Sequence, residues 1–466
     1  MAESHDFGTQ CLRLRTPDLR QSRGNNTLLI WGDDPQWLVV DSELDELLAA
    51  FDGNTTTDRL LARKSEWQAQ HAEVEQTLRE VLKLGVLAPV DASPQPRAPI
   101  DHDAPLPIEN LALNLTRCCN LRCRFCYNLP YLDSGKGELE AAEMTRFLES
   151  ALPLVSKQVT ITVLGGEPLL ESAKLLELAR WAHTHGISIL VSSNGTRVTN
   201  EFARRAREAR MEVQISLDGH TPELHDAIRG TGNFEKTRAG IQTLLRYKVH
   251  TILSMVCHAG NVDGLEDYLK LALKLGVAEA RFIPLKRLGG QKENPLTPVP
   301  LSNLMRRTAE LLQRKPDYLR LLGRDAFSIL GTTSRMSTRR RSCGTGLQTI
   351  MLDADGSLYP CLNCNMPQFK LGSIRDPSFN FADFWKNDPK LHAHRRATAI
   401  ENACDRCRAC VVRYWCLGGC KGENYVNSGA LNTSAVDCAQ QRAAILEMLW
   451  ILAEHPELIR TSAPRC

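Results

Sequence analysis

Cysteines are the chemically informative residues of this chain, with 16 among 466 positions. Cys119, Cys123 and Cys126 form the pattern C-x3-C-x2-C. Three thiolates from one short loop can hold three irons of a [4Fe–4S] cube and leave the fourth iron open to a small molecule. A zinc knuckle is the alternative, but Cys118 is the only candidate for its fourth ligand, and its neighbour Cys119 makes joint ligation awkward.

A second group of cysteines lies near the C-terminal end. Seven of them follow a set order: Cys343 and Cys361 with Gly356 between them, then Cys407, Cys410, Cys416 and Cys420 with gaps of x2, x5 and x3, and finally Cys438. In a reducing compartment, clustered cysteines indicate metal ligands rather than disulfides. A zinc ribbon is the alternative interpretation.

The remaining composition is that of an ordinary globular protein, with 43% hydrophobic and 24% charged residues. The 57 Lys and Arg residues nearly balance the 54 Asp and Glu residues, which predicts no nucleic-acid partner and no anionic membrane partner. No apolar run reaches the ~18 residues of a membrane span, and the start of the chain lacks a secretory signal pattern. We therefore expect a cytoplasmic protein.

Strands and helices alternate from residue 111 onward. We expect strands over 111–115, 159–164, 187–191, 213–217, 251–256 and 280–283, and helices over 138–151, 172–185, 199–209, 234–247 and 263–275. This alternation predicts an α/β fold with a parallel sheet and right-handed crossovers. Six units are too few to close an eight-stranded barrel, so we predict a partial (β/α)6 TIM-like barrel.

Glycine-rich and polar segments follow the second, third and fourth of these strands. They are Gly165-Gly166-Glu167-Pro168, Ser192-Ser193-Asn194-Gly195, and Ser216 to Gly219. Each segment alone is typical of a turn. Because the carboxyl ends of parallel strands share one edge, we expect the segments to meet the first cysteine loop there. Glu167 is a carboxylate that can accept from an ammonium group.

The first cysteine loop together with Gly-Gly-Glu-Pro resembles the radical S-adenosylmethionine (SAM) superfamily, over about residues 109–310. The resemblance implies that Cys119, Cys123 and Cys126 hold a [4Fe–4S] cluster, that SAM chelates its open iron, and that reductive cleavage of SAM gives a 5′-deoxyadenosyl radical. It also places further residues at SAM: Gly165, Gly166 and Glu167 at the amino group, Ser192 and Asn194 at the ribose, and Ser216 and Arg229 at the ribose and carboxylate. A solvated helix residue is the alternative for Arg229. Asp218 is either a catalytic base or a buried turn residue.

The C-terminal cysteines resemble the SPASM extension of radical SAM enzymes, over about residues 343–438. By position, the resemblance implies one auxiliary [4Fe–4S] cluster on Cys407, Cys410, Cys416 and Cys438, and another on Cys343, Cys361 and Cys420. The fourth ligand of the latter stays open between Cys404, Cys364 and an iron that binds substrate. The expected cofactors are three [4Fe–4S] clusters and SAM, and the expected reductant is a flavodoxin or ferredoxin. Free structural thiols are expected at Cys11, Cys118, Cys257 and Cys466.

Residues 25–90 are interpreted as a small unit of its own. Strands are expected over 28–31 and 37–40, a helix capped by Ser42, and a second helix over about 70–84 with Val74, Leu78, Val81 and Leu84 on one face. The pattern resembles the PqqD-like, winged-helix-like element that takes the leader of a ribosomal precursor peptide as an added strand. An accessory domain packed on the barrel is the alternative. The basic residues Arg335, Arg339, Arg340 and Arg341 either contact an acidic peptide or form a solvated loop.

The expected domains are 1–95 (leader recognition), 96–108 (Pro-rich linker), 109–310 (radical SAM core), 311–340 (linker), 341–440 (SPASM) and 441–466 (C-terminal helix and tail). We predict a radical SAM peptide maturase that installs a thioether or carbon–carbon cross-link on a ribosomal precursor peptide. One alternative is formylglycine formation on a protein, as in anaerobic sulfatase maturases. The non-enzymatic alternative is an iron–sulfur electron carrier or zinc scaffold.

Overall fold

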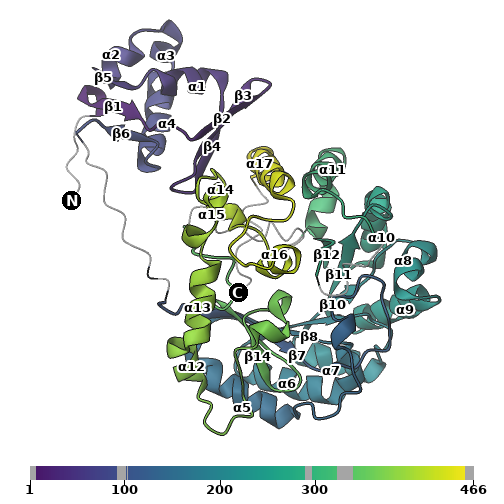
Figure 1. The fold of residues 1–466 in the computed structure, drawn as a ribbon. Helices are drawn as coiled ribbons and strands as arrows, with labels where there is room; N and C mark the ends of the chain where they lie inside the picture. Colours follow the sequence, from purple (N-terminus) through teal and green to yellow (C-terminus); the bar gives the residue numbers. More distant parts are fainter. Residues whose placement is uncertain (1–6, 92–100, 102, 289–295, 323–338, 457–466) are drawn as a thin grey trace. The chain divides into compact units, whose positions relative to one another are not determined.

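The chain divides into two compact units, residues 1–100 and 101–466. The computed structural model describes residues 7–91, 101, 103–288, 296–322 and 339–456 (Figure 1). Parts of both expected linkers lie outside the described residues. They are residues 96–100 and 102 of the linker 96–108, and residues 323–338 of the linker 311–340.

The first unit contains two three-stranded antiparallel sheets, in the orders β5-β1-β6 and β2-β3-β4. The strands are β1 (Cys11–Leu14), β2 (Leu19–Arg23), β3 (Asn26–Trp31), β4 (Gln36–Asp41), β5 (Asp52–Thr56) and β6 (Leu87–Pro89). The helices are α1 (Ser42–Ala49), α2 (Thr57–Leu61), α3 (Ser65–Ala69) and α4 (His71–Lys83).

The hairpin predicted from residues 28–31 and 37–40 forms as β3 and β4, with Ile30 opposite Trp37. Strand β3 has an apolar sequence and is buried from Thr27 to Trp31, so its sequence signal is strong. Strand β2 was not predicted because it is polar, and its last four residues are exposed. A short edge strand of this kind carries no alternating apolar pattern.

Two details of the helices in this unit differ from the prediction. The side chain of Asp41, not Ser42, caps α1 by accepting from the backbone N–H of Leu44 at 2.8 Å. Leu78 and Val81 of α4 are buried as predicted, whereas Leu84 is 49% exposed. Helix α4 ends at Lys83, so Leu84 no longer follows the buried face of the helix.

The second unit is built on a nine-stranded sheet in the order β12-β11-β10-β9-β8-β7-β13-β14-β15. Strands β7 to β12 run parallel in sequence order, which confirms the predicted partial barrel. They are β7 (Ile108–Asn114), β8 (Val155–Leu164), β9 (Ser188–Ser193), β10 (Glu212–Ser216), β11 (His250–Cys257) and β12 (Glu279–Pro284).

Helices connect the successive parallel strands, and Figure 1 shows α5, α6 and α7 along one side of the sheet. The bounds of helix α8 were not predicted, although a helix at Arg229 was considered, because its eight residues span barely two turns, too few for a clear period. The helices are α5 (Ala141–Ala151), α6 (Ser172–Thr184), α7 (Asn200–Glu208), α8 (Pro222–Arg229), α9 (Asn233–Arg246) and α10 (Leu265–Leu275).

The cysteine-rich C-terminal region is continuous with the barrel sheet. Strand β13 (Thr349–Leu352) pairs in parallel with β7, with Ile350 opposite Leu111. Strands β14 (Ser357–Tyr359) and β15 (Gly372–Ser373) then add antiparallel. The sequence alone did not predict this pairing, because β13 and β7 are more than 230 positions apart.

The remaining helices cover the C-terminal half of the second unit. Helix α11 occupies part of the segment expected to be a linker, and it packs against α17, the predicted last apolar helix. Within the described residues, no helix is both long and apolar enough to cross a membrane. These helices are α11 (Leu301–Arg314), α12 (Phe381–Asn387), α13 (Pro389–Thr398), α14 (Asp405–Arg408), α15 (Arg413–Cys416), α16 (Lys421–Ser428) and α17 (Cys438–Glu454).

Candidate active site

The first cysteine loop follows β7 at the carboxyl edge of the parallel sheet. Two hydrogen bonds within the loop shape its backbone. The N–H of Leu121 donates to Sγ of Cys119 at 3.4 Å, and the N–H of Cys126 donates to the carbonyl of Cys123 at 3.1 Å. Cys123 is buried, and Cys119 and Cys126 are half-buried. Hydrogen bonds to sulfur and exclusion of solvent are the means by which proteins tune iron–sulfur clusters.

The Gly165-Gly166 pair holds this loop against β8. The N–H of Gly166 donates to the carbonyl of Thr116 at 2.7 Å, and the N–H of Glu167 donates to the carbonyl of Cys118 at 2.8 Å. A Cβ on Gly166 would lie 2.0 Å from that Cys118 oxygen, and one on Gly165 would lie 2.5 Å from the Thr116 oxygen. The glycines are therefore required by close packing on the cysteine loop, a role that the sequence analysis did not foresee.

Glu167 links the ends of two strands. Its carboxylate is 1% exposed and accepts from Ser193 Oγ at 2.7 Å, from the N–H of Asn194 at 2.7 Å and from the N–H of Leu169 at 3.0 Å. Burial raises the pKa of Glu167 above its ordinary value, although these three donors oppose the shift. The side chain predicted to face the amino group of SAM thus already fixes the edge of the sheet.

The other predicted SAM residues gather at the same edge. Asn194 donates from Nδ2 to Asn120 in the cysteine loop at 2.9 Å. Ser192 lies 3.5 Å from Nε2 of Gln214, and Ser216 ends β10 half-buried. Asn120 is a contributor that sequence reasoning missed, because an Asn inside a cysteine loop has no distinguishing spacing.

Arg229 is buried and paired, so its interpretation as a solvated helix residue was wrong. It is 8% exposed, its Nε donates to Asp218, and its Nη1 lies 3.7 Å from Sγ of Cys123. The guanidinium also lies 5.3 Å from the ring of Phe125. Burial lowers the pKa of Arg229, but the Asp218 carboxylate and the Cys123 thiol raise it above its ordinary value. Burial raises the pKa of Cys123 to about 11, although Arg229 opposes the shift.

Asp218 is fully buried and has two partners for its carboxylate. Besides Arg229, it accepts from the N–H of Val256 at 2.9 Å. Its backbone N–H donates to Nδ1 of His225 at 3.1 Å. Both oxygens of this carboxylate are therefore engaged, one by Arg229 and the other by the N–H of Val256.

Three C-terminal thiols expected to share a cluster lie around one lysine. The charge of Cys420 raises the pKa of Lys286, burial lowers it, and the charges of Glu423, Cys361 and Cys343 raise it further. Asn363 donates from Nδ2 to Sγ of Cys420 at 3.4 Å. The structure thus brings together thiols from three separate segments of the chain.

The other auxiliary group contains Cys407, Cys410, Cys416 and Cys438. Burial raises the pKa of Cys407 to about 12, and contact with Cys404 adds to this shift. Burial likewise raises the pKa of Cys416 to about 11, while N–H groups of Gly418 and Gly419 lower it. Leu417, between Cys416 and Gly418, has a φ of +55°, so the chain turns tightly directly after Cys416.

The remaining cysteines and the basic run have ordinary structural roles. No described cysteine forms a disulfide. Cys11 lies in β1, Cys257 is buried in β11, Cys118 contacts the carbonyl of Asp133 at 3.6 Å, and Cys466 lies outside the described residues. Arg339 donates to the hydroxyl of Tyr414 at 2.7 Å, and Arg341 bonds to the carbonyl of Ala104 at 3.1 Å. Arg335 lies outside the described residues.

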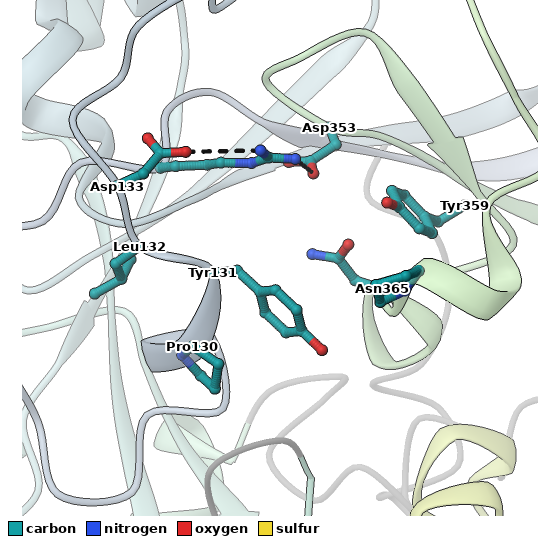
Figure 2. A pocket seen from close by; sticks show the side chains of 9 residues that line it. Pro130, Tyr131, Leu132, Asp133, Asp353, Tyr359 and Asn365 are labelled. Atoms are coloured by element: carbon teal, nitrogen blue, oxygen red, sulfur yellow. Dashed lines mark hydrogen bonds and ion pairs between the residues drawn. The ribbon is translucent and has the colours of Figure 1, made fainter.

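A pocket of about 310 Å³ lies between the first cysteine loop and β14. Figure 2 shows Tyr131 on one side of the space and Asn365, Tyr359 and Asp353 on the other. The lining residues are Arg117, Pro130, Tyr131, Leu132, Asp133, Asp353, Tyr359, Asn365 and Pro367. Arg117 pairs with Asp353 and with Asp355 at 2.9 Å. Tyr127 directly follows Cys126 in the chain. Burial raises the pKa of Tyr127 above its usual range, and the charges of Cys126 and Cys361, one from each cysteine region, add to the shift.

The arrangement fits iron–sulfur clusters better than single metal ions. In the part of the chain that the structure describes, no three Cys, His, Asp or Glu side chains converge on one point as they would around a single ion. A [4Fe–4S] cube is held differently, since each thiolate binds its own iron. Beside the auxiliary thiols, Nζ of Lys421 is buried without a hydrogen-bond acceptor, which fits an anionic group at that point.

Comparison with known families agrees with this geometry. Residues 113–272 match the radical SAM superfamily, and residues 343–411 match the SPASM iron–sulfur cluster-binding domain. The chain therefore contains a radical SAM domain and a SPASM domain and is an enzyme, and its cofactors are [4Fe–4S] clusters and SAM. This excludes the electron-carrier and zinc-scaffold alternatives.

Individual relatives share this architecture at modest identity. The mycofactocin maturase MftC of Mycobacterium tuberculosis is 29% identical over 346 residues, covering 72% of this chain and 84% of the relative. An AdoMet-dependent heme synthase of Oleidesulfovibrio alaskensis is 26% identical over 349 residues, covering 71% and 87%. In fold, Streptococcus suis SuiB, solved with its precursor peptide SuiA, matches 92% of this chain and all of SuiB, at 13% identity and a TM-score of 0.59.

Proposed function

We propose that this enzyme modifies a ribosomally made precursor peptide in the cytoplasm, forming a thioether or carbon–carbon cross-link. The observation that carries the proposal is the three-thiol loop at the carboxyl edge of the sheet, beside a pocket walled by the SPASM region. The name of a PqqA peptide cyclase of Ruegeria pomeroyi, 26% identical to this chain over 322 residues, supports the peptide as substrate. Cys119, Cys123 and Cys126 would hold the cluster, which with SAM and one electron from the reductant would supply the chemistry that removes a hydrogen atom from the peptide.

The residues around the loop have positioning roles in this proposal. Cys119, Cys123 and Cys126 bind the SAM cluster, and Arg229 balances the charge of Cys123. The backbone of Gly165 to Glu167 faces the amino group of SAM, and Ser192 and Ser216 face its ribose. Glu167 and Asn194 act on SAM indirectly, because their side chains already hold the sheet edge and the loop.

We place the reacting part of the peptide in the 310 Å³ pocket. A volume of this size accommodates one or two side chains. Asn365 is 8% exposed and faces the space in Figure 2, so its amide can bond to a peptide group. Tyr131 and Tyr359 supply aromatic walls that exclude water from a radical intermediate.

The first unit is proposed to bind the leader of the same peptide. Among the described residues, strand β2 pairs only with β3, and four of its five residues are exposed. An edge strand with free N–H and C=O groups can accept an added strand. A flavodoxin or ferredoxin is the proposed source of electrons.

The deciding experiment is anaerobic co-expression of the enzyme with short peptides encoded beside its gene, followed by mass spectrometry. We expect a peptide to lose two hydrogens with the wild type and not with Cys119→Ala. If SAM is still converted to 5′-deoxyadenosine while no peptide changes, the peptide proposal is wrong. Haem formation and formylglycine formation are then assayed; the heme synthase relative favours the former.

A further inference from the structure

Cys364 lies inside the first group of auxiliary thiols, although the family pattern does not include it. The turn Leu362–Cys364 packs on the start of α16, directly after Cys420. The approach is close: a Cβ on Gly422 would lie 1.9 Å from the carbonyl oxygen of Asn363. In the same turn the N–H of Cys364 donates to the carbonyl of Cys361 at 3.1 Å. The backbone therefore fixes Cys361, Cys364 and Cys420 beside one another.

The side chain of Cys364 faces that of Cys361. Cys364 is 0% exposed, and its thiol is in hydrogen-bonding contact with the Cys361 sulfur. A buried cysteine can be a simple apolar residue. Here its recorded neighbours are other thiols, Cys361 foremost, which is a poor environment for an apolar role.

The buried lysine gives a second and independent observation. Lys421 is 1% exposed, and its Nζ has no hydrogen-bond acceptor among the described residues. An ammonium group buried without an anion is strongly destabilising. Lys421 directly follows Cys420 in the chain, and its charge acts on the thiol of Cys343, so it lies beside two of the three thiols.

Cys404, the other candidate, lies elsewhere. Its carbonyl accepts from the N–H of Cys407 at 2.8 Å, and its thiol contacts that of Cys407. It therefore belongs to the group of Cys407, Cys410, Cys416 and Cys438, which already has one thiol for each iron of a cube.

We propose that Cys364 supplies the fourth thiolate of the auxiliary cluster held by Cys343, Cys361 and Cys420, with Lys421 as its buried counter-charge. The inference rests on the clusters of the proposed function and deepens it. With four protein thiolates, this cluster has no open iron, so the peptide does not ligate it. Cys404 is a spare thiol at the other cluster.

The test uses the full chain with Cys119, Cys123 and Cys126 all replaced by Ala, so that the open iron of the SAM cluster is absent. Carbon-13 cyanide is added to the reduced, reconstituted protein, and its coupling to iron is measured by ENDOR spectroscopy. We expect no coupling in this background and strong coupling after Cys364→Ala. Coupling already present in the background, or first appearing after Cys404→Ala, would overturn the proposal.

Two controls separate ligand loss from misfolding. Cys257→Ala removes an equally buried thiol from β11 and should create no cyanide coupling. If Cys364→Ala fails to hold the cluster, iron falls from about eight to about four per chain while that of Cys257→Ala stays near eight. Retention of all iron by Cys364→Ala without cyanide binding contradicts the proposal. Failure of the peptide assay is separate, because the cyanide test needs neither SAM nor peptide.

Lys421 is tested through the cluster's potential. Removing a buried positive charge beside an anionic cluster favours its oxidised form. In the same background, Lys421→Met should shift the midpoint of one auxiliary cluster to a more negative value in an EPR-monitored titration, and Lys421→Arg should largely preserve it. Equal midpoints for the wild-type residue and Met would show that Lys421 is not the counter-charge.

Discussion

Nη1 of Arg229 lies 3.7 Å from Sγ of Cys123, and Nε of the same guanidinium donates to Asp218. The arginine thus joins the helix α8 to the cysteine loop across the edge of the sheet. A thiolate ligand carries negative charge, so a fixed cation beside it favours cluster binding. Four predictions follow from this and other contacts.

Replacing Arg229 with Gln should destabilise the protein strongly, because Asp218 is left as a buried charge without its cation. Breaking such a pair costs about 3 to 5 kcal/mol. Denaturant unfolding of the cluster-free protein measures the loss, and Arg238→Gln, which removes an exposed partner of Glu235, is the matched control. The double change Arg229→Gln with Asp218→Asn should recover part of the stability. Equal losses for Arg229→Gln and the control would contradict the pairing.

The free energy of unfolding should decrease as the pH is lowered, because His225 is buried. Burial lowers the pKa of His225 to about 4, whereas an unfolded histidine titrates near 6.5. Between these values the unfolded chain binds more protons, so acidification favours unfolding by up to about 1.4 kcal/mol per pH unit.

The matching variant is His225→Asn, whose amide oxygen can accept from the N–H of Asp218 but does not titrate. Between pH 4 and 6.5 its free energy of unfolding should depend less on pH than that of the wild type. His183→Asn, at an exposed position in α6, should keep the wild-type slope. Parallel curves for the wild type and His225→Asn would refute the prediction.

Gly166→Ala should prevent the cysteine loop from docking on β8. The added Cβ would lie 2.0 Å from the backbone oxygen of Cys118, which cannot move without displacing Cys119. We expect loss of the SAM cluster and of 5′-deoxyadenosine formation, with the auxiliary iron retained. Gly372→Ala, whose nearest neighbour would be 4.0 Å away, should behave like the wild type. A Gly166→Ala enzyme with full iron would mean that the loop has room to shift.

Asn365→Leu should weaken use of the peptide without affecting SAM. Loss of one hydrogen bond to the peptide corresponds to about 1 kcal/mol, or roughly a fivefold higher KM. Formation of 5′-deoxyadenosine in the absence of peptide should be unchanged. Asn387→Leu, at an exposed site that contacts only Asp383 in the described chain, is the control. An unchanged KM would place the reacting residues outside this pocket.

The sequence predicted the parallel core well because each strand there is apolar and each connection is a helix. The thiol spacing and the Gly-Gly-Glu-Pro segment also identified the class of enzyme. What it could not predict were long-range contacts. The pairing of β13 with β7, the contact of Asn194 with Asn120 and the burial of Arg229 all join distant segments by packing, which leaves no local pattern.

Local signals were incomplete where two roles share one residue type. Glycines at 165 and 166 were expected at the amino group of SAM, and the structure adds a second requirement for them, because a Cβ at either position would meet backbone oxygens of the cysteine loop. Cys364 and Cys404 were equivalent in spacing, and only the fold of the turn after Cys361 separates them.

The parallel pairing of β13 with β7 has a mechanical consequence. One strand leads directly into the loop of the first cluster, and the other begins a few residues after Cys343. Their hydrogen-bonded register fixes how these two segments lie relative to one another within the sheet. Electron tunnelling between the two iron sites should therefore proceed over a constant distance, whichever peptide is bound.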